Sequence, residues 1–320
     1  MKLNFTENIP TLDLSDFTEG NSNKKNAFIK QLGEAYQEIG FVAIVNHGFT
    51  PVKQNALYDA VKHFFELDDN VKQQYDGVSS GGQRGYTGKG KEHAAGRSVG
   101  DLKEFYHVGK HIEGSASKHY QKNIFPNETP LFEKETVYCY DKLEETGKVM
   151  LSAISLFLGM EGEHFDTKVN RGISILRPIH YFPIADPESI PADAVRAAEH
   201  GDINLITLLM GASADGLQVQ RKDGEWISVK SHKDSLVVNV GDMLERYTNG
   251  VLKSTIHRVV NPPKEKMGTS RYSIPFFMHA NPEMRLDCLK ECISETNPKK
   301  YEDITAGEFL LERLKAIGLA

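Results

Sequence analysis

Four tripeptides of the form His-x-Asp or His-x-Glu are the groups of residues in this chain best suited to hold a metal ion. An imidazole and a carboxylate two residues apart project to the same side of an extended segment, so both can reach one ion. With 12 histidines and 44 acidic residues among 320, chance alone gives 12 × 44/320, or about 1.7, such tripeptides. The tripeptide by itself therefore decides nothing, and the surrounding sequence must distinguish the four.

Three of the four have an ordinary structural interpretation. His232-Lys-Asp234 lies in a polar turn between two strand-like runs, and His164-Phe-Asp166 follows a helix and is typical of a surface connection. In the segment before His111-Ile-Glu113, the pair His107 and His111 would suit a metal if both lay on one helix. Gly109 and the neighbouring β-type residues make a helix doubtful there.

His200-Gly-Asp202 differs because it directly precedes 203–210, a run too apolar and too rich in β-formers for a surface turn. A third ligand must then come from another strand, and the best candidate is His257, inside the apolar run 254–260. Two histidines and one carboxylate, with further positions open, form the ligand set of non-haem Fe(II) oxygenases. The alternative for each histidine alone is a hydrogen-bonded structural role.

Arg271 and Ser273 form a second candidate site at the start of a predicted strand. Their side chains share one face of that strand and offer a planar cation and a hydroxyl, which together suit one carboxylate. The alternative is a salt bridge from Arg271 to a distant acidic residue.

These residues must be positioned by elements of two kinds. Amphipathic periodicity predicts helices at 23–39, 51–65, 131–158 and 306–319, with Asn23 as a cap, Pro51 in a first turn and Gly40 as a terminator. Alternating or short apolar runs predict strands at 9–17, 41–45, 173–182, 203–210, 217–221, 226–230, 235–240, 254–260 and 271–279. The close spacing of the later strands, with turn residues between them, favours an antiparallel sandwich or barrel.

The segment 77–100 contains eight glycines. It lacks the Gly-x4-Gly-Lys-Ser/Thr pattern of a phosphate-binding loop, and no strand leads into it with a helix following. Two interpretations stay open: a mobile loop near the mouth of an active site, or a plain flexible connection.

Composition excludes several classes of protein. The charged residues give 38 − 44 = −6, which argues against a nucleic-acid or membrane-surface binder, and 39% hydrophobic residues exclude wholesale disorder. No apolar run reaches 18 residues and the first twenty residues lack a signal-peptide pattern, so we expect a cytoplasmic chain. Three cysteines are too few for a disulfide framework or a thiolate zinc site.

Taken in order, several motifs resemble the isopenicillin-N-synthase-like family of 2-oxoglutarate- and Fe(II)-dependent dioxygenases. The opening of the chain is similar at 9–14 and 40–48. Further similar segments are 199–209 with His-Gly-Asp, 224–227, 240–244, 248–250, Lys253-Ser-Thr-Ile-His-Arg-Val259 and Ser270-Arg-Tyr-Ser-Ile-Pro-Phe276. The resemblance covers nearly the whole chain, and the ordered series is far more specific than any single tripeptide.

The resemblance implies a mainly β fold with flanking helices, built on a double-stranded β-helix (jelly-roll) core. It implies one catalytic unit over 1–320. In that unit a helix-rich N-terminal region, 1–170, packs on the core, 171–285 forms the core with the metal site, and 286–320 is a C-terminal helical segment. By match, His200, Asp202 and His257 would be the iron ligands.

The same resemblance assigns Arg271 and Ser273 to the distal carboxylate of 2-oxoglutarate. It also implies a co-substrate contact for Tyr181, which falls where many members have Asn-Tyr-Tyr-Pro. This chain departs from that pattern, since His180 replaces the Asn and Phe182 the second Tyr.

The implied activity uses Fe(II), 2-oxoglutarate and O2, releases succinate and CO2, and oxidises a small organic substrate. Alternatives are an Fe(II) oxidase of the isopenicillin-N-synthase type that uses no 2-oxoglutarate, an ethylene-forming enzyme that fragments 2-oxoglutarate, and a metal-binding jelly roll without turnover. Arg84, Lys89, Lys91 and Arg97 favour a carboxylate or amino-acid-like substrate, unless they are only solvated loop cations. We expect no nucleic-acid or membrane partner, and a monomer.

Overall fold

The computed structural model describes most of the chain. The described residues are 8–77, 82–92, 100–110, 112, 119–186, 188, 190–191, 194–211, 215–230 and 234–316. The interpretations given for His111-Ile-Glu113 and His232-Lys-Asp234, the cation Arg97 and the end of the last predicted helix therefore lie wholly or partly outside them.

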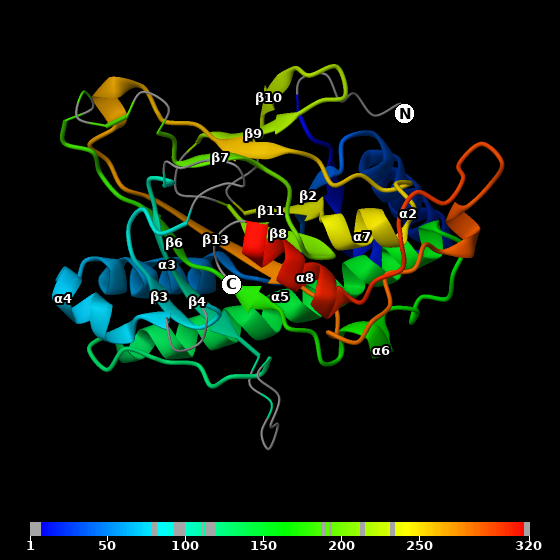
Figure 1. Cartoon of the computed structure of the whole chain (residues 1–320). Coiled ribbons are helices and arrows are strands. Elements are labelled where there is room, and N and C mark those ends of the chain that lie inside the picture. Colours follow the sequence, from blue (N-terminus) through cyan, green and yellow to red (C-terminus); the bar gives the residue numbers. More distant parts are fainter. Residues whose placement is uncertain are drawn as a thin grey trace.

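Two β-sheets form the centre of the molecule (Figure 1). The larger sheet has the order β1 (Thr11–Asp13), β2 (Phe41–Val45), β11 (Leu236–Val240), β8 (Ile206–Met210), β13 (Arg271–Met278), β5 (Ile175–Leu176), β4 (Glu104–Gly109) and β3 (Gly85–Thr87), with β6 (Ile179–Tyr181) paired to both β13 and β4. The smaller sheet has the order β10 (Trp226–Ser228), β9 (Leu217–Gln220), β12 (His257–Val259) and β7 (Ala197–His200). Apart from β1 with β2, the named pairings are antiparallel.

Helices flank the sheets, and α5 (Pro130–Phe157) runs beneath the strands in Figure 1. They are α1 (Leu14–Thr18), α2 (Ser22–Glu38), α3 (Pro51–Phe65), α4 (Asp69–Lys72), α5 (Pro130–Phe157), α6 (Asp166–Val169), α7 (Asp242–Tyr247) and α8 (Ala306–Ala316), with short 3-10 turns at Gln73–Tyr75, Lys264–Lys266 and Lys290–Cys292. The predicted mainly β fold with flanking helices is confirmed. In the described portion of the chain, no helix combines the length and apolar composition that a membrane span needs.

The packing of α5 determines which face of β13 points inward. The ring of Tyr140 on α5 lies 5.0 Å from that of Phe276, and Gly147 leaves room for Met278, whose Sδ would be 2.4 Å from a Cβ at that position. Because side chains alternate across a strand, the even-numbered residues 274, 276 and 278 join the helix-covered core. The odd-numbered residues of β13 consequently face the opposite side, toward the smaller sheet.

Several local predictions are corrected. The run 9–17 is not one strand, because the carboxylate of Asp13 accepts the backbone N–H of Ser15 (2.9 Å) and so ends β1 and starts α1. The cap of α2 is Asn21 rather than Asn23. Pro51 in a first turn and Gly40 after α2, with φ +71°, are as predicted.

The interpretation of His164-Phe-Asp166 as a surface connection is wrong for its middle residue, whereas His164 is half-buried and Asp166 exposed. Phe165 is buried in the main core, and His164 Nε2 lies 2.8 Å from the hydroxyl of Tyr247. The three cysteines are buried and form no disulfide, as their number suggested.

Candidate active site

The side chains of His200, Asp202 and His257 meet at one end of the smaller sheet. His200 is the last residue of β7 and His257 the first of β12, and these strands place the two residues directly opposite each other. Their ring centres are 4.4 Å apart, and Asp202 follows two residues beyond the end of β7. One ligand atom from each of the three lies within 4.8 Å of the others, as a single metal ion requires.

Backbone carbonyls orient both imidazoles. Nδ1 of His200 lies 2.7 Å from the carbonyl of Ala198, and Nδ1 of His257 lies 3.1 Å from that of Thr255. Because a carbonyl only accepts, Nδ1 carries the hydrogen and Nε2 keeps its lone pair. Both Nε2 atoms face Asp202 Oδ1, at 3.9 Å and 3.7 Å, so three donor atoms converge.

The carboxylate of Asp202 is held by its other oxygen. Oδ2 accepts hydrogen bonds from Thr207 Oγ1 (2.6 Å) and Asn239 Nδ2 (2.8 Å), and Asn204 in turn donates to Thr207 (2.9 Å). Burial alone raises the pKa of Asp202, but the positive charges that His257 and His200 carry when protonated, together with these hydrogen bonds, outweigh it, so the pKa is lowered. The carboxylate is therefore ionised, with Oδ1 directed to the ion position.

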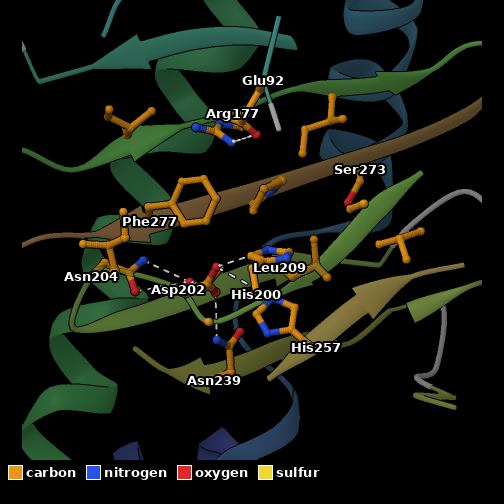
Figure 2. A pocket seen from close by; sticks show the side chains of 18 of the residues that line it. Glu92, Arg177, His200, Asp202, Asn204, Leu209, Asn239, His257, Ser273 and Phe277 are labelled. Atoms are coloured by element: carbon orange, nitrogen blue, oxygen red, sulfur yellow. Dashed lines mark hydrogen bonds and ion pairs between the residues drawn. The ribbon is translucent and has the colours of Figure 1, made fainter. Parts of the chain in front are cut away.

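The residues present fit a divalent iron ion. Burial lowers the pKa of His200 to about 4, with a further contribution from the charge of His257, so its imidazole is neutral at pH 7. Neutral imidazole nitrogens with one carboxylate oxygen suit a first-row transition metal. Figure 2 shows these three side chains converging below β13.

A cavity of about 360 Å³ extends from the three residues to the inner face of β13. Its lining includes the odd-numbered residues of that strand and the one beyond it: Arg271, Ser273, Pro275, Phe277 and His279. This is the face that α5 leaves uncovered. From the C-terminal end of the chain, Leu310, Arg313 and Leu314 of α8 also line the cavity.

Arg271 and Ser273 lie at one end of the cavity. Arg271 is only 1% exposed, and its guanidinium carbon lies 4.8 Å from the ring centre of Tyr181, its partner in the β13–β6 pairing. A second guanidinium, that of Arg196, lies 5.9 Å from the same ring. Burial and, after it, the positive charge of Arg271 lower the pKa of Arg196, so two cations lie close together at this end. Such a region favours an anion.

His180, the departure noted beside Tyr181, points away from the cavity. Its Nδ1 lies 2.7 Å from Glu104 Oε1 and its Nε2 lies 2.9 Å from Ser270 Oγ. The substitution therefore belongs to a hydrogen-bond network behind the sheet and leaves Tyr181 in the cavity lining.

The wall of the cavity also holds a cluster of charged residues that sequence reasoning missed. Lys103 Nζ contacts Glu92 Oε1 (2.7 Å) and Asp101 Oδ2 (2.8 Å), and Arg177 Nη1 contacts Glu92 Oε1 (3.1 Å). Arg177 Nε donates to His107 Nε2 (2.6 Å). Burial alone raises the pKa of Glu92, but the positive charges of Arg177 and Lys103 hold it well below its usual range.

A signal existed for some of the missed residues. Asn204, Thr207 and Asn239 are polar positions inside otherwise apolar strand runs, and Arg177 interrupts the apolar run at β5. Glu92 had no such signal. It comes, with Gln83, from the glycine-rich segment 77–100, and both line the cavity, so the described portion of that segment lies at the site.

Comparison with known proteins gives a consistent picture. The family model for the 2OG-Fe(II) oxygenase superfamily matches residues 172–280, and the model described as non-haem dioxygenase in morphine synthesis, N-terminal, matches residues 9–130. The 2-oxoglutarate-Fe(II) type oxidoreductase hxnY of Emericella nidulans is 31% identical, with 94% of this chain and 88% of that protein covered.

Solved structures are similar over nearly the full chain. A protein of Caulobacter crescentus assigned to the 2OG-Fe(II) oxygenase family is 39% identical, with 97% and 99% of the two chains covered and a TM-score of 0.86. A full-length Neurospora crassa protein in complex with alpha-KG is 30% identical, with 98% of each chain covered and a TM-score of 0.87. Another structure of that Neurospora protein contains alpha-KG and thymine.

Proposed function

Because the chain belongs to the 2OG-Fe(II) oxygenase superfamily, we propose that His200, Asp202 and His257 hold its iron. The protein is a 2-oxoglutarate- and Fe(II)-dependent dioxygenase with a jelly-roll core, and it uses O2 as its oxidant. The bound iron supplies the redox chemistry that couples decarboxylation of 2-oxoglutarate to succinate with oxidation of a second substrate. The converging donor atoms of the three side chains are the observation that carries the ligand assignment.

The co-substrate is assigned to the opposite face of the cavity. Arg271 and Ser273 bind the distal carboxylate of 2-oxoglutarate, and Tyr181 contacts the same molecule. Their common position on paired strands β13 and β6, together with the positive charge of Arg196 nearby, supports this role. Anchoring one end of a short dicarboxylate leaves its keto end directed along the cavity toward His200 and His257.

The whole chain, 1–320, works as one catalytic unit. Strand β2 of the helix-rich N-terminal region, 1–170, pairs with β11 of the core, 171–285, and β4 pairs with β5 and β6. Helix α8, from the segment 286–320, lines the cavity. The ordered motifs further support a place in the isopenicillin-N-synthase-like group. The monomeric state and cytoplasmic location stay predictions.

The second substrate is a small organic molecule, since the superfamily acts on such molecules and the cavity lies near the lower end of the range of about 300–1,000 Å³ for small-molecule pockets. Thymine in the Neurospora structure supports a ring compound of that size. The carboxylate or amino-acid-like substrate expected from loop cations stays a prediction. Of those cations, Arg84 donates to backbone carbonyls, Lys89 pairs with Asp69, and Lys91 pairs with Asp76.

An anaerobic titration tests the proposed function. Fe(II) and 2-oxoglutarate added together should produce a visible charge-transfer band that neither produces alone, and succinate should form once O2 is admitted. Asp202→Ala should abolish both signals. Bound metal with neither band nor oxygen uptake would favour a binding protein. Substrate oxidation without 2-oxoglutarate would favour the oxidase alternative. Ethylene release from 2-oxoglutarate alone would favour the ethylene-forming alternative.

A further inference from the structure

His279 is a buried histidine in the cavity wall whose ring makes no hydrogen bond to the described residues. It follows β13, is 7% exposed and lines the cavity. Its main chain is held in place, since its N–H donates to Ser174 Oγ (3.1 Å) and its carbonyl oxygen packs against Gly172, 2.2 Å from where a Cβ would lie. The ring has no such partner. Native proteins pair most buried polar side chains, so an unpaired ring in a cavity wall indicates a ligand.

The two ring nitrogens of His279 differ in what can reach them. Nδ1 is fully covered by protein atoms and has no partner among the described residues. Nε2 has no partner there either, but it is not one of the fully covered atoms. It is therefore the ring nitrogen that a molecule in the cavity can reach.

The ring of His279 is neutral and carries its hydrogen on Nε2. Burial lowers the pKa of His279 to about 4, the negative charge of Asp202 opposes this shift, and the positive charge of Arg177 adds to it. A neutral imidazole has one N–H and one bare nitrogen. Orphaned buried N–H groups are rarer in native structures than under-satisfied acceptors, so the covered Nδ1 keeps the lone pair. Nε2–H is then a donor that faces the cavity without an acceptor from the described protein.

This donor lies near the iron ligands and away from the proposed co-substrate anchor. Phe277, two residues before His279 on the same face, is directly opposite Thr207 in the β13–β8 pairing, and Thr207 donates to Asp202. Figure 2 shows the Phe277 ring above the Asp202 carboxylate. Phe277 follows Arg271 by 277 − 271 = 6 residues, or roughly 20 Å of extended strand, and His279 lies farther still. A five-carbon acid anchored at Arg271 does not span this length, so the donor is left to another molecule.

We propose that His279 is a specificity-determining residue whose Nε2–H donates a hydrogen bond to a carbonyl oxygen of the prime substrate. The substrate class is a small neutral carbonyl compound whose apolar part packs against the ring of Phe277. The inference rests on the proposed function, because it names what that oxygenase binds for oxidation.

The charges around His279 favour a neutral acceptor over a charged group. Asp202 and Arg177 act on this position with opposite signs, so a substrate carboxylate or a substrate cation would each be attracted by one and repelled by the other. Removing such a charge from water is costly when no full partner awaits it. A carbonyl oxygen accepts the one available hydrogen bond at a much smaller desolvation cost.

Paired probes test this proposal on the wild-type holoenzyme. With Fe(II) and 2-oxoglutarate bound under anaerobic conditions, the change in the charge-transfer band is titrated with δ-valerolactone and γ-butyrolactone. Their partners, tetrahydropyran and tetrahydrofuran, keep the ring and its ether oxygen and replace only the carbonyl by CH2. We expect at least one lactone to bind, and to bind about 5-fold or more tightly than its partner.

Two variants assign that preference to Nε2. His279→Leu should reduce it to less than about 2-fold, because no donor remains. His279→Gln keeps a neutral N–H donor and should give a preference between those of the Leu variant and the wild type. His63→Leu, which replaces an exposed histidine of α3 outside the cavity, is the matched control and should keep the wild-type preference. If His279→Leu does not fold, the wild-type pairs still decide the question.

Equal binding of lactone and ether, no binding of either lactone, or a preference unchanged in folded His279→Leu would overturn the role of His279, while the band itself leaves the oxygenase assignment intact. Failure of the band to form with Fe(II) and 2-oxoglutarate would instead refute the proposed function, and this inference with it.

Discussion

Replacement of Arg271 by Leu tests the co-substrate site most directly. The side chain is 1% exposed and packs over the ring of Tyr181 at 4.8 Å, on the face of β13 that α5 leaves open. In the proposed complex its guanidinium holds the distal carboxylate of 2-oxoglutarate by paired hydrogen bonds. Leu removes the charge and the donors and retains an apolar side chain in the strand.

The size of the effect follows from the burial of Arg271. Removing one partner of a buried, hydrogen-bonded charge pair costs about 2–5 kcal/mol, and each 1.4 kcal/mol is a factor of ten in affinity. Arg196 stays near Tyr181 and retains some of the positive potential, so we expect the lower half of the range. This predicts that 2-oxoglutarate binds about 30- to 300-fold more weakly.

The assay is the anaerobic charge-transfer titration, in which 2-oxoglutarate is added to the Fe(II) protein. Arg271→Lys should give an intermediate loss, because it keeps the charge without the planar fork. Arg285→Leu, which removes an arginine with a 59% exposed side chain, is the control and should bind normally. A folded Arg271→Leu protein with wild-type affinity for 2-oxoglutarate would refute the assignment. A loss confined to the prime substrate would favour an oxidase that binds its substrate's own carboxylate there.

Two further predictions concern the metal end of the cavity. Asn239→Ala removes a hydrogen bond that orients Asp202, so Fe(II) affinity measured by chelator competition should fall about 10- to 100-fold, and unchanged affinity would contradict this positioning role. Burial lowers the pKa of His279 from 6.5 to about 4 in the folded protein. As the pH falls, the unfolded chain therefore binds a proton at this residue before the folded protein does. The metal-free protein should consequently lose about 2–3 kcal/mol of stability from this residue between pH 7 and pH 4.5. Urea unfolding should show a shallower decline for His279→Gln than for the wild type; equal declines would exclude the effect.

Local patterns predicted most of the strands and helices that surround the site. The apolar runs that form β8, β11 and β13 could be identified without knowing which strands they pair with, because a strand buried on both faces has a continuous apolar sequence. The short strand β7, which carries His200, was not predicted. Its four residues include a Glu and a His, and it is a strand because β12 pairs with it.

The candidate ligands could be predicted from the same apolar runs, but the hydrogen bonds that hold them in place could not. His200 and His257 stood out because each adjoins or interrupts an apolar run. Asn239 also interrupts an apolar run but was missed, and the sequence does not show that its amide contacts Asp202, 37 residues away. Side-chain hydrogen bonds between strands depend on register, which is determined by the packing of both sheets.

The residue types and their order along the chain determined that this protein could hold a transition metal with imidazole and carboxylate ligands, and could bind a carboxylate beside it. Only the tertiary structure decided that both sites open into one cavity, because α5 covers the even-numbered face of β13 and so assigns the odd-numbered face to the interior. It also placed Glu92, a residue of an unpatterned glycine-rich segment, in the wall of that cavity. The position of such a residue depends on its ion pairs with Lys103 and Arg177, and no local periodicity in the sequence predicts these pairs.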